Sequence, residues 1–411
     1  MKNISIKILF SLFILVARCT AWNIPSGQEQ HTTFIVSFDG FRWDYLNRGI
    51  TPNIAKLQHR GVSALSLRPA FPTKTFPNHL TLLTGVYPEH HGILHNEFLN
   101  PRTSERYRVG DTSAVRNSTW YNAEMIWETA ARQGVKTASY FWPCSDVHKK
   151  TGEPTYLESY DRNRPYLQRV NDALAWLQLP KEQRPQFIAL YFEETDNQGH
   201  EFGPNSPQIN FAVQQMDSIV GLLVQGIEHL GLLDATNIIL VSDHGMTEID
   251  TSRVVNIASF LPNVKVQYSG YGQVMMIQPQ KGEEEKVYSV LKENERHYRV
   301  FKKESMPEYY EFSEHPFILP IILVADLGWT LTNRELSSKE RSTFGKGNHG
   351  YEKDCLDMHG IFVAAGSDFK KDFRTGTLWN IDVYPLLCTI LKITPAKNID
   401  GNLERIGFIL R

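Results

Sequence analysis

Short apolar runs alternate with amphipathic helical segments along most of the chain. Residues 32–38, 186–192 and 237–242 are rich in β-branched and aromatic side chains and have the length of strands. Before the third run, Ser206 and Pro207 form a helix start that is followed by apolar residues at helical spacing. Strands that are apolar throughout need cover on both faces. We therefore expect an α/β fold with a mainly parallel central sheet and helices on both faces.

The first 21 residues have the layout of a secretory signal peptide. Lys2 and Lys7 precede an apolar run, and small residues lead up to Ala21, after which we expect cleavage. The run is shorter than the roughly 20 residues of a typical membrane span. We expect an exported protein, secreted or periplasmic, without stable membrane insertion after cleavage. A retained N-terminal anchor is the alternative.

The remaining sequence divides into one large domain with a small insert. Residues 22–31 are polar and are expected to form a linker, and the main domain is expected over residues 32–405, with a tail at 406–411. Within it, residues from about 250 to 340 have a compact β-α-β pattern that differs from the strand and helix alternation around it. We expect this segment to be an α+β insert with its own small sheet.

Charge and cysteine content narrow the classes of function. The formal net charge is −2, so no global basic field would attract nucleic acid, and specific nucleic-acid binding is not expected. After the signal segment the cysteines are Cys144, Cys355 and Cys388. Because an exported protein can form disulfides, Cys355 with Cys388 is the first pair to test, and three buried thiols are the alternative. Asn117 opens a glycosylation sequon that a eukaryotic host could use.

Thr75 stands where an extended run is expected to meet a helix. It lies within residues 72–78, ahead of an apolar segment over residues 79–83 that has helical character. A helix N-terminus offers unpaired N–H groups and the positive end of the dipole, which together favour an anion. A threonine in this position is more often a cap than a nucleophile. Aspartates and histidines elsewhere in the chain favour the nucleophile.

Those aspartates and histidines follow the predicted strands. Any one of them alone could be a turn, a cap or a surface pair. The carboxyl ends of parallel strands meet at one edge of a sheet, so together they can converge there. The candidates at these positions are Asp39, Asp196, His200, Asp243, His244 and, in a glycine-flanked loop, His349.

With Thr75 these side chains provide enough ligands for two metal ions. Carboxylate and imidazole donors without cysteine suit zinc in a catalytic site. Two such ions about 3.5–4 Å apart would clamp the attacking and leaving oxygens of an in-line displacement at phosphorus. A threonine hydroxyl bound to one of them would lose its proton near neutral pH.

The motifs around these positions resemble those of the ectonucleotide pyrophosphatase/phosphodiesterase family of the alkaline phosphatase superfamily. The resemblance runs from about residue 33 to residue 405, and the combination of motifs is highly specific. They are VSFDGFR at 36–42, TKTFPNH at 73–79, TGVYP at 84–88, HGI at 91–93, Trp142-Pro143, Asp196 to His200, SDHGM at 242–246 and NHGY at 348–351.

The resemblance implies a role for each matching position. Thr75 would be the nucleophile and would form a phospho-threonine intermediate. Asn96 would donate to a phosphate oxygen, with the backbone N–H of Phe76 opposite. The Phe76 ring and Tyr160 would stack on a nucleobase. One zinc ion would be held by Asp196, His200 and His349, and the other by Asp39, Thr75, Asp243 and His244.

The chain departs from the family pattern at two positions. Thr195 stands where many members have proline before the aspartate, and Cys144 stands where many have glycine. Neither change removes a predicted ligand, although Cys144 could alter the substrate pocket.

The resulting hypothesis is an exported two-zinc phosphodiesterase that cleaves small nucleotide substrates to nucleoside 5′-monophosphates. A phosphodiesterase for choline- or lysophospholipid-linked phosphate is the alternative on the same site. A catalytically inactive binding protein is the alternative from another class, and the intact set of ligands argues against it. The sequence makes no prediction of the oligomeric state.

Overall fold

The computed structural model describes residues 31–147, 149 and 152–411, and residues 31–411 form one compact unit. The predicted signal segment over residues 1–21 and nearly all of the predicted linker lie outside the described residues. Among the helices of the described residues, none combines the length and the apolar character needed to cross a membrane.

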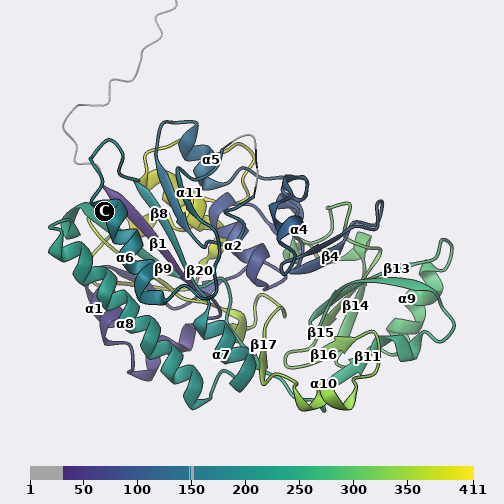
Figure 1. Ribbon diagram of the computed structural model, residues 1–411. Coiled ribbons are helices and arrows are strands. Elements are labelled where there is room, and N and C mark those ends of the chain that lie inside the picture. Colours follow the sequence, from purple (N-terminus) through teal and green to yellow (C-terminus); the bar gives the residue numbers. More distant parts are fainter. Residues whose placement is uncertain (1–30, 148, 150–151) are drawn as a thin grey trace, which may run out of the picture. The chain divides into compact units, whose positions relative to one another are not determined.

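An eight-stranded sheet forms the centre of this unit (Figure 1). Five neighbouring strands are parallel, whereas β18 runs antiparallel to both β9 and β2. The predicted mainly parallel sheet is therefore confirmed. The strands, in spatial order, are β19 (Phe373–Thr375), β2 (Val62–Ala64), β18 (Phe362–Ala365), β9 (Thr236–Val241), β1 (Thr32–Phe38), β8 (Phe187–Phe192), β6 (Thr137–Tyr140) and β7 (Tyr156–Glu158).

Alternate residues of strand β1 face two different layers of helices. Phe34, Val36 and Phe38 belong to a core that includes apolar residues of α1 (Pro52–Arg60), α6 (Tyr166–Leu177) and α8 (Pro207–His229). Ile35 faces a second core, together with residues of α2 (Thr75–Thr84), α5 (Ile126–Ala131) and α11 (Val383–Ile390). This is the period of two expected of a strand buried on both faces. The helix start at Ser206 is as predicted, because its hydroxyl accepts the Ile209 N–H.

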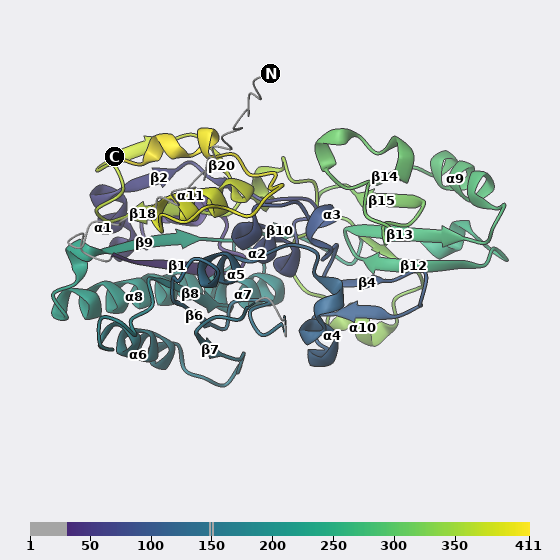
Figure 2. The same ribbon diagram turned by 90° about the horizontal axis from the view of Figure 1, so that it is seen from above.

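Residues 266–325 contain a separate four-stranded antiparallel sheet. It runs in the order β12 (Val266–Tyr271), β13 (Val274–Pro279), β15 (Ile321–Ala325) and β14 (Tyr298–Lys302), and α9 (Glu284–Glu293) packs against it. Figure 2 shows β12 lying beside β4 (Glu97–Leu99) of the main domain. The insert thus approaches the main domain through its β12–β13 hairpin.

Two expectations about the C-terminal part of the chain need correction. Cys144, Cys355 and Cys388 are all free thiols, so the suggested Cys355–Cys388 disulfide is wrong. Cys388 packs within the core around α2, whereas Cys355 packs against the core of the insert. Residues 406–411 do not extend as a tail from the main domain. Ile406 and Ile409 are fully buried.

Candidate active site

Three neighbouring strands of the sheet bring most of the predicted site residues to one edge. Asp39 directly follows β1, while Asp243 and His244 follow the adjacent β9. Strand β8 lies on the other side of β1 and leads into α7 (Glu194–Phe202), which carries Asp196 and His200 one helical turn apart. The order of the strands therefore determines that these side chains meet.

His349 reaches the same place through a short strand pair. It follows β17 (Gly347–Asn348), which pairs antiparallel with β10 (Thr247–Glu248) just after His244. The rings of His349 and His244 lie 3.4 Å apart and nearly parallel. Residues more than 100 positions apart in the sequence thus share one site.

The predicted ligands form two adjacent groups. In the first, Oδ1 of Asp196 lies 3.4 Å from Nε2 of His200 and 3.7 Å from Nε2 of His349. In the second, Nε2 of His244 lies 3.2 Å from Asp39, 3.0 Å from Asp243 and 3.2 Å from the Thr75 hydroxyl.

Backbone contacts fix the orientation of the three imidazole rings. Their Nδ1 atoms lie 2.8–2.9 Å from carbonyl oxygens, to which each ring donates a hydrogen bond. The carbonyls belong to Gly347 for His200, to Gly245 for His244 and to Thr73 for His349. Each ring therefore turns its Nε2 atom toward the carboxylates, which is the arrangement that metal-binding histidines adopt.

Some carboxylate oxygens of the site receive no hydrogen bond from the described residues. Asp39 Oδ1, Asp196 Oδ1 and Asp243 Oδ2 are buried and accept no hydrogen bond from the described residues. Burial, together with the negative charges of Asp243 and Asp196, raises the pKa of Asp39 to about 7. Because buried negative charge is costly without compensation, these groups fit a cation. Combinations of these aspartates and histidines lie close enough together to hold metal ions.

His79 is also close to the aspartates but has both ring nitrogens engaged. Its Nδ1 donates to the Thr75 carbonyl at 2.9 Å, and its Nε2 accepts from the Ser37 hydroxyl at 2.8 Å. Burial lowers the pKa of His79 to about 4, so the ring is neutral. His79 was not among the site residues predicted from the sequence, although its place one helical turn after Thr75 was a usable signal.

Two further contacts hold Asp39 in place, and neither was predicted from the sequence. The Tyr191 hydroxyl donates to Asp39 Oδ2 at 2.5 Å, and Thr195 donates to the Asp39 carbonyl at 2.5 Å. Thr195 stands at one of the positions where the chain departs from the family pattern, and its hydroxyl links α7 to the end of β1. Tyr191 carried no pattern in the sequence that would have identified it, because it reads as one more aromatic residue in a buried strand.

Thr75 is the first residue of α2, and its hydroxyl does not cap the helix. The N-cap residue is Lys74, which makes no side-chain cap bond. The Thr75 hydroxyl instead lies 3.2 Å from Nε2 of His244 and lines a cavity. The capping explanation for this threonine is therefore wrong, and its hydroxyl is available for chemistry.

The cavity beside Thr75 has a volume of about 460 Å³ and also contains the predicted substrate-binding residues. The Phe76 N–H donates to Asn96 Oδ1 at 3.1 Å, so Asn96 engages the donor that was expected to face a phosphate. The Asn96 amide nitrogen has no partner among the described residues. Tyr160 is 51% exposed and packs edge-on against Phe141. Cys144 is buried in the wall of the same cavity.

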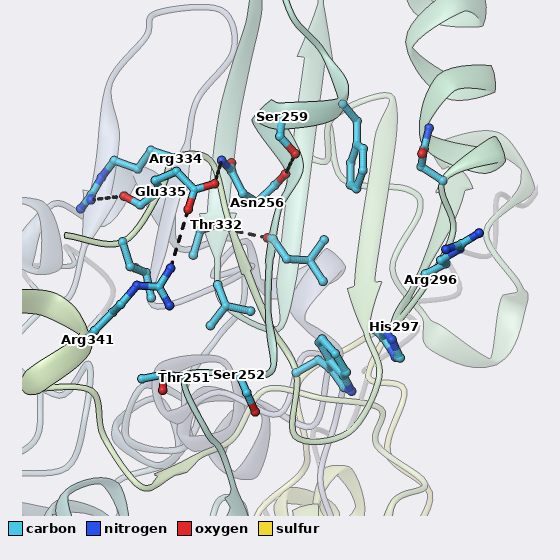
Figure 3. A pocket seen from close by; sticks show the side chains of 16 residues that line it. Thr251, Ser252, Asn256, Ser259, Arg296, His297, Thr332, Arg334, Glu335 and Arg341 are labelled. Atoms are coloured by element: carbon cyan, nitrogen blue, oxygen red, sulfur yellow. Dashed lines mark hydrogen bonds and ion pairs between the residues drawn. The ribbon is translucent and has the colours of Figure 1, made fainter. Parts of the chain in front are cut away.

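A larger hollow of about 710 Å³ lies in the insert and contains none of the predicted site residues (Figure 3). Two of its arginines, Arg334 and Arg341, are paired with glutamates. Arg334 contacts Glu340 at 2.9 Å, Arg341 lies 3.7 Å from Glu335, and Asn256 donates to Glu335 at 3.0 Å.

Comparison with known proteins identifies the family of the chain. The family model described as type I phosphodiesterase/nucleotide pyrophosphatase matches residues 33–352, which include every predicted site residue. The chain belongs to this family. The resemblance to ectonucleotide pyrophosphatase/phosphodiesterases is thereby confirmed.

Relatives within the family match over most of this chain. Human ectonucleotide pyrophosphatase/phosphodiesterase family member 1 is 36% identical over 399 residues, which are 94% of this chain and 42% of that protein. Venom phosphodiesterase CdcPDE of Crotalus durissus collilineatus is 34% identical, over 95% of this chain and 48% of its own length. The chain therefore spans about half the length of these curated relatives.

A solved structure within the family has the same fold. Murine ectonucleotide pyrophosphatase/phosphodiesterase 5, an inactive variant in complex with AMP, superposes with a TM-score of 0.87 at 32% identity. The match covers 93% of this chain and all of that one.

Proposed function

We propose that this chain is an exported, two-zinc phosphodiesterase and nucleotide pyrophosphatase that releases nucleoside 5′-monophosphates. One observation carries the proposal. A threonine hydroxyl at a helix N-terminus lies 3.2 Å from a histidine that contacts two buried aspartates, and it opens onto a cavity. The names of the venom relatives support export, as does the expected signal peptide.

In the proposed mechanism Thr75 is the nucleophile. Zinc ions held by Asp196, His200 and His349, and by Asp39, Thr75, Asp243 and His244, would lower the pKa of the Thr75 hydroxyl and offset charge in the transition state. The Thr75 oxygen forms a bond to phosphorus as the bond to the leaving oxygen breaks. Water then attacks the phospho-threonine, which releases the monophosphate and restores the hydroxyl.

Two polar features of the chain would serve the phosphoryl group. The Asn96 amide nitrogen is held in place because the Phe76 N–H donates to the other end of the same amide. From that position it donates to an oxygen on which charge develops. The N-terminus of α2 adds the positive end of its dipole.

The aromatic residues of the cavity favour a nucleotide. Phe76 and Tyr160 both line it, and each base has a flat face for an aromatic ring. The solved relative that binds AMP supports the same substrate class. The same rings could instead hold a choline headgroup through cation–π contact, which keeps the choline or lysophospholipid alternative open.

Initial rates on three chromogenic esters test the proposal. They are a nucleoside 5′-monophosphate p-nitrophenyl ester, p-nitrophenyl phosphorylcholine and p-nitrophenyl phosphate, each with the wild type and Thr75→Ala. We expect a preference for the first ester and a loss of at least about 10³-fold in Thr75→Ala, because the nucleophile is removed. Preference for the second would move the substrate to choline phosphodiesters. No turnover by zinc-loaded wild type would favour an inactive binding protein.

A further inference from the structure

The residue before Thr75 connects the active site to the insert. Lys74 is only 4% exposed, and its ammonium group donates to the His349 carbonyl and to Gln273 Oε1, each at 2.7 Å. Gln273 is fully buried and lies between β12 and β13. One side chain thus touches the segment of the nucleophile, the loop of a predicted ligand and the insert.

The insert holds Gln273 firmly. The carbonyl of Gln273 accepts the Ala325 N–H at 2.8 Å, which attaches the turn to β15. Gly272, next to it, exchanges two backbone hydrogen bonds with Leu331 at 3.2 and 2.6 Å. The acceptor that Lys74 meets is therefore part of a rigid hairpin and not of a loose loop.

The same hairpin also supports the segment that carries Asn96. Ser269 in β12 accepts the Leu99 N–H at 2.9 Å, and the Tyr271 ring packs edge-on against His95 with ring centres 5.4 Å apart. His95 and β4 lie on either side of Asn96 in the sequence. The hairpin thus contacts both the segment that carries Thr75 and the segment that carries Asn96.

We propose that the insert is a positioning element of the active site, and that it acts through the Lys74–Gln273 hydrogen bond. This inference rests on the proposed function, because a positioning role affects catalysis only if Thr75 is the nucleophile. Neither Lys74 nor Gln273 lines the cavity, so neither is expected to touch substrate. Their contribution is to keep the Thr75 oxygen at a fixed place relative to Asn96. This matters for the rate because a small displacement of a reacting group can lower it about 10²-fold.

Kinetics of Gln273→Met and Gln273→Glu test this role. Methionine has a similar length but no oxygen acceptor, whereas glutamate restores one. We expect Gln273→Met to lower kcat on the nucleotide ester about 10- to 100-fold with KM within about 2-fold, because positioning affects the transition state and not uniform binding. Gln273→Glu is expected to recover most of kcat. Lys74→Met removes the bridge from its other end and should repeat the loss.

Lys353→Met is the matched control. Lys353 is as deeply buried as Lys74, but its ammonium group lies over the Tyr87 ring at 5.4 Å and makes no contact with the site residues. This variant should lower the melting temperature and leave kcat unchanged. If Lys353→Met and Gln273→Met reduced kcat equally, or if Gln273→Met kept wild-type kcat, the positioning role would be wrong.

Hydrogen exchange supplies a readout that does not depend on turnover. In Gln273→Met we expect faster exchange in peptides that cover residues 72–79 and 93–99, and unchanged exchange in α8, which lies across the sheet. An inactive wild type with this local loosening would contradict the proposed function alone. Unchanged exchange in both peptides, with full activity, would contradict the positioning role alone.

Discussion

The cavity beside Thr75 and the hollow in the insert differ in how their charges are balanced. In the larger hollow of the insert, Arg334 and Arg341 are paired with glutamates of the same segment. In the smaller cavity, Oδ1 of Asp39 and Oδ1 of Asp196 are buried and accept no hydrogen bond from the part of the chain that the structure describes. The chain itself balances the charges of these two arginines, whereas the aspartate oxygens remain available to a cation. Unbalanced buried charge therefore identifies the functional site better than volume does.

The strongest way to break this comparison is to remove one charge from the predicted metal ligands beside the smaller cavity and one from the hollow of the insert. Asp243→Asn should lower kcat/KM on the nucleotide ester by at least about 10³-fold, because the second group of ligands loses the carboxylate that contacts His244. Glu335→Gln, its matched control in the insert, should change kcat/KM less than about 2-fold. Comparable losses in the two variants would contradict the assignment of the chemistry to the smaller cavity.

A smaller effect is expected from the aromatic wall of the active-site cavity. Tyr160→Leu should raise KM for the nucleotide ester about 5- to 100-fold, since base stacking contributes about 1–3 kcal/mol. KM for p-nitrophenyl phosphate, which has no base, should stay within about 2-fold. An equal rise for both esters would show that Tyr160 supports the fold of the cavity and does not stack on a base.

The smallest effect concerns stability without metal. In metal-free protein, burial raises the pKa of Asp39 from 3.8 to about 7. Between pH of about 4 and about 7, the folded state therefore keeps a proton on Asp39 that the unfolded state has already released. Stability from this group therefore falls as pH rises from about 4 to about 7. Between pH of about 4.5 and 7, the melting temperature of chelator-treated wild type should fall a few degrees more than that of Asp39→Asn. Parallel curves in calorimetry would contradict this.

Sequence patterns predicted much of the fold because they report local burial. The strand over residues 32–38 has the predicted bounds, and the helix predicted to start at Ser206 and Pro207 begins there, because the apolar pattern of each segment is unambiguous. Strand β12, with Gln267 and Gly270 among its residues, has no clear strand pattern and was not predicted.

The candidate site was predictable to the extent that its residues follow strands. Asp39, Asp243 and His244 could be located because the carboxyl ends of parallel strands meet. The Cys355–Cys388 pairing failed because spacing carries no information about which core each cysteine joins. The contact of Lys74 with Gln273 joins residues 199 positions apart, and only the packing of the insert brings them together.

The metal content of the protein tests the central claim most directly. Elemental analysis should be made on protein purified without chelator, for the wild type, Asp196→Asn and the insert control Glu335→Gln. We predict about two zinc ions per chain in the wild type and in Glu335→Gln, and about one or fewer in Asp196→Asn, whose carboxylate faces both His200 and His349. Less than one metal ion per wild-type chain, with no activity restored by added zinc, would contradict the account.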